Sequence, residues 1–285
     1  MKFSDINIRD PYILTYEGKY YLYGTRATNT WGAVDVKTIG FDVYVSEDME
    51  SWSEPKEIFS YFEGFWGDRQ YWAPEVHYYK GKFYMFASFV SEVTYRGTAI
   101  LVSDTPNGRF VPHSNGAVTP SNWSCLDGTL WVEDGVPYIV FCHEWTQIKN
   151  GTVCALRLSD DLKESIGEPI ELWSAGDASW RHDLDGNGSF VTDGPFLLRV
   201  DGELISIWSS FSKGEYVEAI ARSDNGKISG KWTIDDSLLF EKNGGHGMIF
   251  TDLNGQLCFI YHTPNNTPLE RPAVKIISYD DLRRK

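Results

Sequence analysis

The sequence predicts an all-β fold: a single-domain, five-bladed β-propeller that spans residues 1–285. Two observations favour this fold. One hairpin-like pattern recurs five times, beginning at residues 10, 73, 127, 193 and 246, and a repeat of roughly 50 residues or more is typical of propeller blades. No segment shows a sustained helical period of apolar residues, which argues against an α/β fold. The alternative is a β-sandwich in which the similarity of the repeats is accidental.

Each repeat reads as a strand, a turn that ends in glycine, and a second strand rich in aromatic residues, which is the pattern of a β-hairpin. The five second strands are expected at residues 19–24, 82–87, 136–141, 203–208 and 256–261. A turn motif that contains serine follows each hairpin, as at Val45-Ser46-Glu47-Asp48. This motif predicts a third strand that ends in a tight turn.

The composition of the chain argues against two classes of binding partner. The net charge is −14 at neutral pH. An acidic surface repels phosphate backbones and anionic lipids, so neither nucleic acid nor a membrane is an expected partner. Aromatic residues make up 15% of the chain; they favour strands and also provide flat apolar faces on which a sugar ring can lie. The N-terminus has no apolar signal-peptide core, so we expect a cytoplasmic protein, or a secreted one if a signal has been trimmed.

The four cysteines are expected to be buried free thiols. Cys125, Cys142, Cys154 and Cys258 form no C-x-x-C pair, so the sequence does not signal a structural zinc site. Three of them lie in apolar, strand-like sequence, where a free cysteine behaves as a small apolar residue.

Polar residues recur at the start of the repeats. The innermost strand of each propeller blade lines the channel, so equivalent positions in the five repeats should form a ring at one channel mouth. These positions are Asp10, Ala73, Asp127, Asp193 and His246. Three carboxylates near one axis repel one another and raise at least one pKa, which is typical of a functional site. Carboxylates without a nucleophile triad indicate acid–base hydrolysis, for which glycoside cleavage is the standard case.

Five short motifs at these positions resemble glycoside hydrolase family 43, the inverting five-bladed propeller enzymes that act on arabinose- and xylose-containing glycans. The resemblance covers essentially the whole chain and is carried by Arg9-Asp10-Pro11, Trp72-Ala73-Pro74-Glu75, Leu126-Asp127-Gly128, Asp193-Gly194-Pro195 and Gly245-His246-Gly247. It implies that Asp10 is the general base and that Asp127 orients the general acid and modulates its pKa. The family motif in blade four usually reads Glu-Gly-Pro, so the resemblance implies Asp193 as the acid.

Two of these implied roles have alternatives. Aspartate is one methylene shorter than glutamate, and a displacement of about 1 Å can cost roughly a hundredfold in rate. Glu144, Glu215 and Glu218 are therefore the alternative acids. His246 resembles the family's channel histidine, which implies a cation, often calcium, near the axis. Calcium prefers oxygen ligands, so a hydrogen-bonded histidine without metal is the alternative. No cofactor is expected to be required.

Further residues are predicted to contact the substrate. Trp72, Trp145 and Trp31 are expected near the channel mouth as a stacking platform, with ordinary packing between blades as the alternative for each. Glu75 is predicted to hydrogen-bond a sugar hydroxyl or to pair with Arg26, which is itself a predicted substrate contact. Arg271, in the closing segment, is also predicted to reach the site.

These features predict an inverting glycosidase whose partner is an oligosaccharide or polysaccharide. The resemblance implies release of a pentose from a plant-type glycan, with α-L-arabinofuranosidase as the first hypothesis and β-xylosidase as the second. Two alternatives stay open. One is a β-galactofuranosidase, because that ring is stereochemically similar to arabinofuranose. The other is a glycan-binding propeller without activity, because fold does not imply catalysis.

Overall fold

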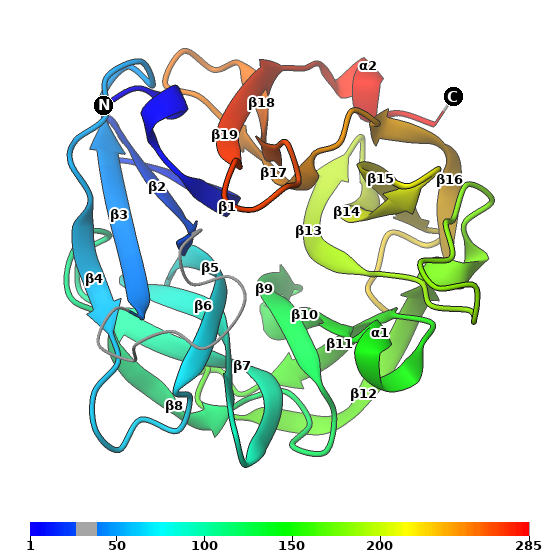
Figure 1. The fold of residues 1–285 in the computed structure, drawn as a ribbon, viewed down its shortest axis with the longest axis horizontal. Coiled ribbons are helices and arrows are strands. Elements are labelled where there is room, and N and C mark those ends of the chain that lie inside the picture. Colours follow the sequence, from blue (N-terminus) through cyan, green and yellow to red (C-terminus); the bar gives the residue numbers. More distant parts are fainter. Residues whose placement is uncertain (27–38, 285) are drawn as a thin grey trace.

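A computed structural model describes residues 1–26 and 39–284, and it places five antiparallel sheets in a ring (Figure 1). The five-bladed propeller predicted from the repeats is therefore confirmed. Each of the first four blades has four strands, and the fifth has three. Two single-turn helices, α1 (Trp145–Ile148) and α2 (Tyr279–Leu282), lie outside the sheets. Among the described residues, no helix is long and apolar enough to cross a membrane.

The predicted hairpins form the two inner strands of every blade. The innermost strands are β1 (Ile8–Tyr16), β5 (Arg69–Tyr79), β9 (Cys125–Glu133), β13 (Asp193–Val200) and β17 (Gly245–Thr251). The second strands are β2 (Lys19–Arg26), β6 (Lys82–Ser91), β10 (Val136–His143), β14 (Glu203–Ser212) and β18 (Leu257–Thr263). The glycine that ends each turn has a positive φ of 73–87°, which explains its recurrence in the sequence.

The outer strands complete the blades. The third strands are β3 (Gly40–Ser46), β7 (Thr94–Ser103), β11 (Thr152–Leu158), β15 (Glu215–Ser223) and β19 (Arg271–Ile276). Each ends within two residues of the serine of the turn motif, as predicted. The fourth strands are β4 (Lys56–Ser60), β8 (Val111–Ala117), β12 (Ser165–Ser174) and β16 (Trp232–Phe240). The repeats did not predict these strands, because they lie at the rim, are largely exposed and have little apolar pattern.

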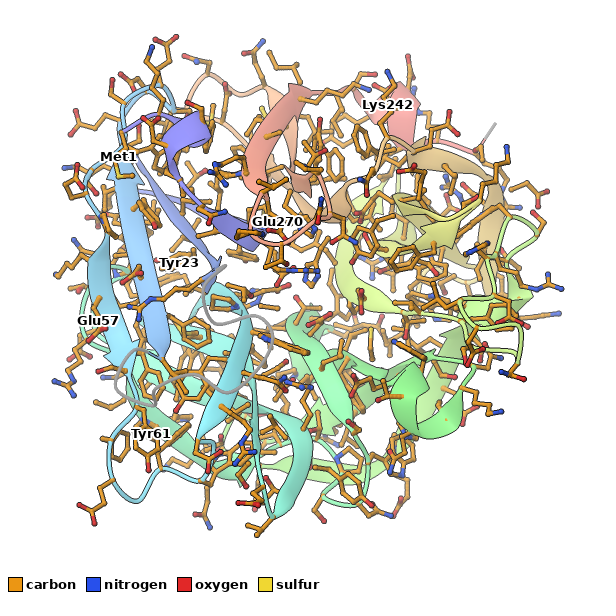
Figure 2. All side chains as sticks on the ribbon, in the orientation of Figure 1. Met1, Tyr23, Glu57, Tyr61, Lys242 and Glu270 are labelled. Atoms are coloured by element: carbon orange, nitrogen blue, oxygen red, sulfur yellow. The ribbon has the colours of Figure 1, made fainter. Side chains whose placement is uncertain are left out.

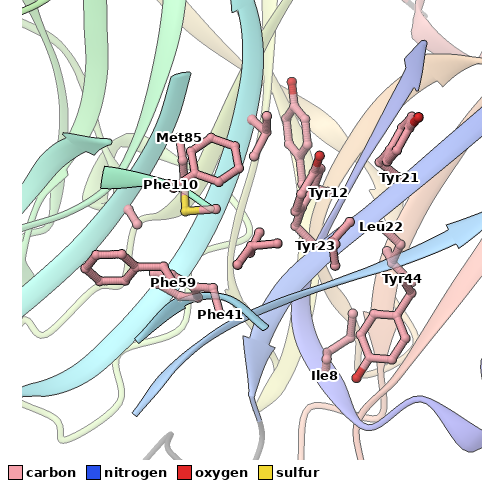
Figure 3. Close-up of a cluster of buried hydrophobic side chains, with 14 of the residues drawn as sticks. Ile8, Tyr12, Tyr21, Leu22, Tyr23, Phe41, Tyr44, Phe59, Met85 and Phe110 are labelled. Carbon is pink, nitrogen blue, oxygen red and sulfur yellow. The ribbon is translucent and has the colours of Figure 1, made fainter. Parts of the chain in front are cut away.

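The apolar core lies between neighbouring blades. Second strands such as β2 and β6 are buried along almost their whole length, because both faces of each sheet pack against another blade. This two-sided burial explains why their sequences are continuously aromatic rather than alternating. Figure 3 shows one such cluster, in which Tyr23 and Leu22 of β2 pack near Phe41, Phe59 and Met85.

The ring is closed by contacts between the first and last blades, which lie at opposite ends of the chain. The side chain of Asn7 donates to the carbonyl oxygens of Pro268 and Glu270, at 2.8 Å each. Figure 2 shows Glu270 near the middle of the ring, whereas Glu57 and Lys242 lie at its periphery. The segment before β19 therefore connects the N-terminal strand to the channel mouth.

Candidate active site

A backbone bulge occurs at the same place in the innermost strand of every blade. The register with the second strand shifts at this point in all five cases, and such bulges re-aim side chains next to active sites. One residue of each bulge has a φ between 46° and 56°, in the left-handed region that residues other than glycine rarely adopt. These bulge residues are Asp10, Ala73, Asp127, Gly194 and His246.

The prediction that Asp193 is equivalent to the other two aspartates is wrong by one residue. Gly194 is the bulge residue of blade four, and Asp193 precedes it. Glycine is required there because a Cβ atom on residue 194 would lie 2.6 Å from Cδ2 of His246. The carboxyl group of Asp193 therefore leaves the backbone from a different position in the bulge than those of Asp10 and Asp127.

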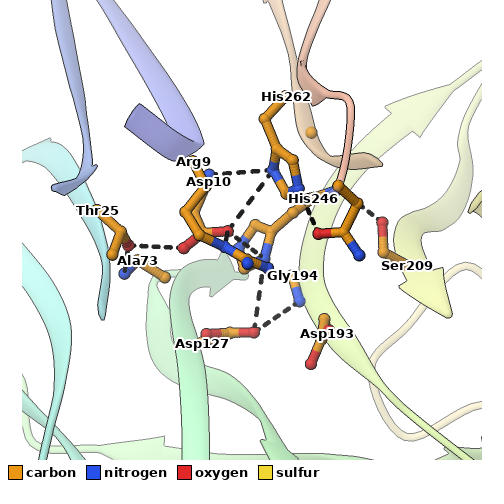
Figure 4. Close-up of polar contacts among 12 residues, drawn as sticks. Arg9, Asp10, Thr25, Ala73, Asp127, Asp193, Gly194, Ser209, His246 and His262 are labelled. Carbon is orange, nitrogen blue, oxygen red and sulfur yellow. Dashed lines mark hydrogen bonds and ion pairs between the residues drawn. The ribbon is translucent and has the colours of Figure 1, made fainter. Parts of the chain in front are cut away.

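Side chains satisfy the backbone N–H group of every bulge residue. In four of the five bulges the acceptor comes from the second strand of the preceding blade; in the fifth it is the carboxylate of Asp127. The pairs are Asp10 N to His262 Nδ1 (3.2 Å), Ala73 N to Thr25 Oγ1 (2.7 Å), Asp127 N to Ser88 Oγ (2.9 Å), Gly194 N to Asp127 Oδ2 (3.0 Å) and His246 N to Ser209 Oγ (2.6 Å). Figure 4 shows this network around Asp10 and Asp127.

A pocket of about 520 Å³ lies at this mouth of the ring. Seven residues predicted from the sequence line it: Asp10, Asp127, Asp193, His246, Trp72, Trp145 and the alternative acid Glu144. Its other lining residues include Arg9, Tyr216, Asn265 and Asn266. The guanidinium group of Arg96 lies 3.6 Å from the centre of the Trp72 ring. One face of that indole is therefore covered, which leaves only the other face for contact with a ligand.

Asp10 is held in its ionised form. The hydroxyl of Thr25 donates to its Oδ2 at 2.6 Å, and Nδ1 of His246 lies 3.2 Å from its Oδ1. Burial alone would raise the pKa of Asp10, but the charges of His246 and Arg9 and the hydrogen bond from Thr25 hold it below its ordinary value. The carboxylate can therefore accept a proton from a bound water at any physiological pH.

Asp127 occupies the same bulge position as Asp10 but has the opposite electrostatic balance. Burial, together with the neighbouring carboxylates of Asp193 and Asp10, raises its pKa to about 7. His246 opposes this shift from farther away, with Nδ1 3.8 Å from Oδ2 of Asp127. The amide of Gly194, which donates to the same oxygen, also favours the ionised form.

Asp193 lies beside Asp127 and also holds a proton more tightly than an ordinary aspartate. Burial raises its pKa, while His246, the hydroxyl of Tyr216 and the charge of Arg9 oppose the shift without overcoming it. The Tyr216 hydroxyl donates to Oδ2 of Asp193 at 2.9 Å, which fixes the orientation of the carboxyl group. Asp193 is therefore suited to donate a proton.

Two histidines at the site have opposite charge states. Burial would lower the pKa of His246, but the carboxylates of Asp10, Asp127 and Asp193 raise it to about 9, so the ring is a cation at neutral pH. Burial and nearby Arg9 lower the pKa of His262 to about 3, so this ring is neutral.

Neutral His262 links the Asp10 bulge to the pocket wall. Its Nδ1 accepts the N–H of Asp10, so Nε2 carries the proton and donates to Oδ1 of Asn265 at 3.1 Å. Because the ring is neutral, the 3.7 Å separation between Nδ1 and Oδ1 of Asp10 is not an ion pair. Asn265 itself lines the pocket.

Three predicted substrate contacts do not line the pocket. Glu75 is buried and lies 3.1 Å from Nε2 of His77, rather than pairing with Arg26. Arg26 forms ion pairs with Asp42 and Glu57 in its own blade. Arg271 donates to backbone carbonyls, including that of Ser4 at 2.9 Å, and so connects blade five to the N-terminal segment. Trp31 lies outside the described residues.

The alternative acids are spread over three environments. Glu144 lines the pocket, where the hydroxyl of Ser124 donates to its Oε2 at 2.6 Å. Glu215 is exposed at the start of β15. Glu218 is fully buried, accepts hydrogen bonds from Ser209 and Gly247, and does not line the pocket. Only Glu144 therefore competes with Asp193 by position.

The described residues do not fit a calcium site made by protein side chains. Among them, no group of three or more His, Cys, Asp and Glu side chains is arranged to hold a metal ion. His246 directs Nδ1 at two carboxylates and carries a proton at neutral pH, which opposes metal binding through that atom. The calcium implied by the resemblance stays a prediction, and no step below depends on it.

The sequence did not predict four residues of the site, of which Arg9 and Tyr216 line the pocket. Arg9 and Tyr216 contact the carboxyl groups of Asp10 and Asp193, and Thr25 and His262 hold the bulge amides. Arg9 stands within a motif noted in the sequence, but nothing local indicates that its side chain enters the pocket. Tyr216 comes from the third strand of blade four, which the comparison of inner strands did not cover.

Together these groups form an acid–base site. One carboxylate stays ionised, two others have raised pKa values, and a buried imidazolium lies among them. Environments that push the pKa values of neighbouring carboxyl groups apart are characteristic of a paired general base and general acid. A propeller with this arrangement at its mouth, and with tryptophans in the pocket wall, has the features of a glycoside hydrolase.

The comparison with known proteins agrees. The chain matches the family model of glycosyl hydrolases family 43 over residues 4–280 and belongs to that family. Its structure is similar to the endo-arabinase of Bacteroides thetaiotaomicron VPI-5482, with a TM-score of 0.89 and 38% sequence identity; the match covers 98% of this chain and 96% of that one.

Curated relatives are more distant. The extracellular exo-α-(1→5)-L-arabinofuranosidase ArbA of Cellvibrio japonicus (strain Ueda107) is 25% identical over 86% of this chain and 72% of its own length. The extracellular endo-α-(1→5)-L-arabinanase 1 of Bacillus subtilis (strain 168) is 27% identical over 50% of this chain. The match covers 45% of that relative, so the chain spans less than half of its length.

Proposed function

We propose that this glycoside hydrolase cleaves L-arabinofuranosyl linkages with inversion of anomeric configuration, with xylosyl linkages as the second candidate. The observation that carries this proposal is the opposed ionisation of two carboxyl groups in one pocket. The pKa of Asp10 is lowered and that of Asp193 is raised, each by named neighbours. An inverting glycosidase needs a base and an acid in these two states at the same pH.

In the proposed mechanism, Asp10 removes a proton from a water molecule that attacks the anomeric carbon. Asp193 donates its proton to the glycosidic oxygen as the bond from that oxygen to the anomeric carbon breaks. One carbon–oxygen bond forms, one breaks, and the two carboxyl groups exchange protonation states before solvent resets them. Asp127 interacts electrostatically with both carboxyl groups, and its negative charge, when present, favours the protonated form of Asp193.

The choice of arabinose rests on the pocket and on the relatives. Trp72 and Trp145 offer apolar faces for a sugar ring, and Arg9 and Asn265 offer hydrogen bonds to hydroxyl groups. A similar structure and two curated relatives carry names that specify arabinan or arabinofuranoside cleavage. The chain lengths of the products distinguish endo from exo action.

The test compares activated and natural substrates. The protein is incubated with nitrophenyl α-L-arabinofuranoside, β-xyloside and β-galactofuranoside, and with α-1,5-linked arabino-oligosaccharides. Proton NMR of the first product gives the anomer, and chromatography gives the chain lengths. We expect the inverted anomer from the arabinofuranosyl substrates. The retained anomer would contradict the mechanism. Glycan binding without turnover on either substrate class would indicate a binding propeller, and cleavage of galactofuranoside alone would indicate a galactofuranosidase.

Three variants separate the roles of the carboxyl groups. Asp10→Asn is expected to lose at least about a hundredfold in kcat on every substrate, because the base is needed for any leaving group. Asp193→Asn should lose far more on oligosaccharides than on nitrophenyl glycosides, whose leaving group needs little protonation. Glu144→Gln is the matched comparison. If Glu144→Gln shows the leaving-group dependence and Asp193→Asn does not, Glu144 is the acid.

A further inference from the structure

The bulge amides follow a rule that has one exception. In four blades the residue on the second strand opposite the first residue of the bulge supplies the acceptor for the next blade's amide. Thr25 stands opposite Arg9, Ser88 opposite Trp72, Ser209 opposite Asp193, and His262 opposite Gly245. All four accept the amide of the following blade's bulge residue.

Blade three departs from this rule at Cys142. This residue stands opposite Leu126, the equivalent position, and its side chain is fully buried. By the rule, the side chain of Cys142 would accept a hydrogen bond from the amide of Gly194. That amide donates instead to Oδ2 of Asp127 at 3.0 Å. Sulfur is a weak hydrogen-bond acceptor and donor, whereas a carboxylate is a strong acceptor. The amide therefore has a better partner than the thiol.

The consequence is visible in the comparison of Asp10 with Asp127. The hydroxyl of Thr25 accepts the Ala73 amide and also donates to Oδ2 of Asp10 at 2.6 Å. Cys142 offers Asp127 no such hydroxyl, and among the described residues the closest polar contact of Asp127 is the Gly194 amide. Gly194 follows Asp193 directly in the chain, so this hydrogen bond connects the Asp127 carboxylate to the backbone of the proposed acid.

We propose that Cys142 is a positioning residue: by withholding a hydroxyl group, it leaves the Gly194 amide to the Asp127 carboxylate and so fixes Asp193 relative to Asp127. This inference rests on the proposed function, in which Asp193 is the acid and Asp127 its neighbour. A serine at position 142 would take over the Gly194 amide, as Ser88 and Ser209 do in their blades, and would donate to Asp127, as Thr25 does to Asp10.

Other charged and titratable groups also face Asp127. They come from different elements: Asp10 (β1), Arg96 (β7), Cys142 (β10), Asp193 (β13), Tyr216 (β15) and His246 (β17). A hydroxyl donor at position 142, at the short distance seen for Thr25, stabilises the Asp127 anion more than the longer hydrogen bond from the Gly194 amide does. The pH dependence that follows the ionisation of Asp127 should therefore move to lower pH in Cys142→Ser, with the other groups unchanged.

The first experiment measures kcat and its pH profile for Cys142→Ser, Cys142→Ala and Cys154→Ser. Cys154 is equally buried in β11 of the same blade but takes no part in the bulges. We expect kcat to fall roughly tenfold or more in Cys142→Ser, with the acid limb at lower pH, because the amide leaves Asp127. Cys142→Ala should keep the acid limb in place. If Cys142 only filled space, Cys142→Ala would be the more damaged variant and neither profile would move.

The second experiment does not depend on turnover. The Gly194 amide is followed by NMR in glycine-labelled protein across the pH range, with Asp127→Asn to assign the titration. In the parent and in Cys142→Ala the Gly194 signal should titrate with Asp127, and in Cys142→Ser it should not. A Gly194 signal that titrates equally in all three proteins would overturn the inference. If the parent shows the titration but cleaves no glycoside, the proposed function fails, while the role of Cys142 in leaving the Gly194 amide to Asp127 stands.

Discussion

Asp10 and Asp127 show how the environment of a residue sets its chemistry. Both are aspartates at the same bulge position, and both are buried. Asp10 has a hydroxyl donor and two nearby cations, whereas Asp127 has two nearby carboxylates, one backbone amide and the more distant His246 cation. Their pKa values consequently move in opposite directions. No property of the aspartate side chain itself predicts this difference.

Tyr216 gives a prediction at the scale of one hydrogen bond. Its hydroxyl favours the ionised form of Asp193. Tyr216→Phe removes that donor, so the pKa of Asp193 should rise further and the basic limb of kcat/KM should move to higher pH. Tyr261→Phe is the control, because Tyr261 lies in β18 outside the pocket lining. A basic limb that stays in place in Tyr216→Phe would argue against Asp193 as the acid.

The sequence contains a signal for the residues that hold the bulges, but they were not predicted. Thr25, Ser88, Cys142, Ser209 and His262 each follow directly after the six-residue aromatic strand that the repeats did predict. The predicted second strands end one residue before these five positions. Asp193 rather than Gly194 was aligned with Asp127, because Asp193-Gly194 matches Asp127-Gly128 residue for residue. Only the backbone conformation separates the two alignments.

At the scale of a strand, the bulge ties catalysis to the packing of blades. Thr25 on β2 both donates to Asp10 and accepts the amide of Ala73 in the next blade. Thr25→Val keeps the shape and removes both bonds. The pKa of Asp10 should rise toward its ordinary value, which moves the low-pH step of kcat/KM that belongs to Asp10, below the step set by Asp127, to higher pH. The orphaned Ala73 amide should cost about 1–3 kcal/mol of stability.

Two measurements check this prediction: the pH–rate profile and the free energy of unfolding. Thr251→Val is the control, because Thr251 is exposed at the opposite end of β17. If the stability of Thr25→Val falls while the low-pH step that belongs to Asp10 stays fixed, Thr25 supports the fold without acting on Asp10.

Glu218 on β15 gives a prediction about stability and pH. Burial raises its pKa to about 8, against the opposing effect of hydrogen bonds from Ser209 and Gly247. Because the folded protein holds the proton of Glu218 more tightly than the unfolded chain does, the contribution of this proton to stability is fully present below pH 4.5, the pKa in the unfolded chain. That contribution is lost as the pH rises toward about 8, the pKa in the folded protein. In that window the parent should lose about 1.4 kcal/mol per pH unit relative to Glu218→Gln.

Thermal unfolding of the parent and of Glu218→Gln between about pH 5 and about pH 9 measures this difference in stability. The control is Glu215→Gln, an exposed position on the same strand, which should follow the parent. Equal pH dependence of the parent and Glu218→Gln would show that Glu218 is already ionised in the folded protein at neutral pH.

At the scale of the whole molecule, the fold was predictable because a propeller repeats its pattern. Five copies of one hairpin gave the number of blades and the mouth at which polar residues gather. The sequence did not predict which side chains cross between blades, because such pairs join residues far apart in the chain. Arg271 shows this limit: it was expected in the site, but it contacts Ser4 at the other end of the chain.

The ring has no covalent closure, so contacts between the first and last blades should limit its stability. Asn7 makes two hydrogen bonds across this junction, and Arg271 binds the carbonyl of Ser4. Asn7→Ala should lower the free energy of unfolding by about 1–3 kcal/mol, which lowers Tm by a few °C or more. Asn254→Ala is the control, because the side chain of Asn254 donates to Asp252 in a turn within blade five. Scanning calorimetry of both variants gives their Tm values. Similar Tm values would mean that apolar packing of β1 against blade five holds the junction and that these hydrogen bonds contribute little.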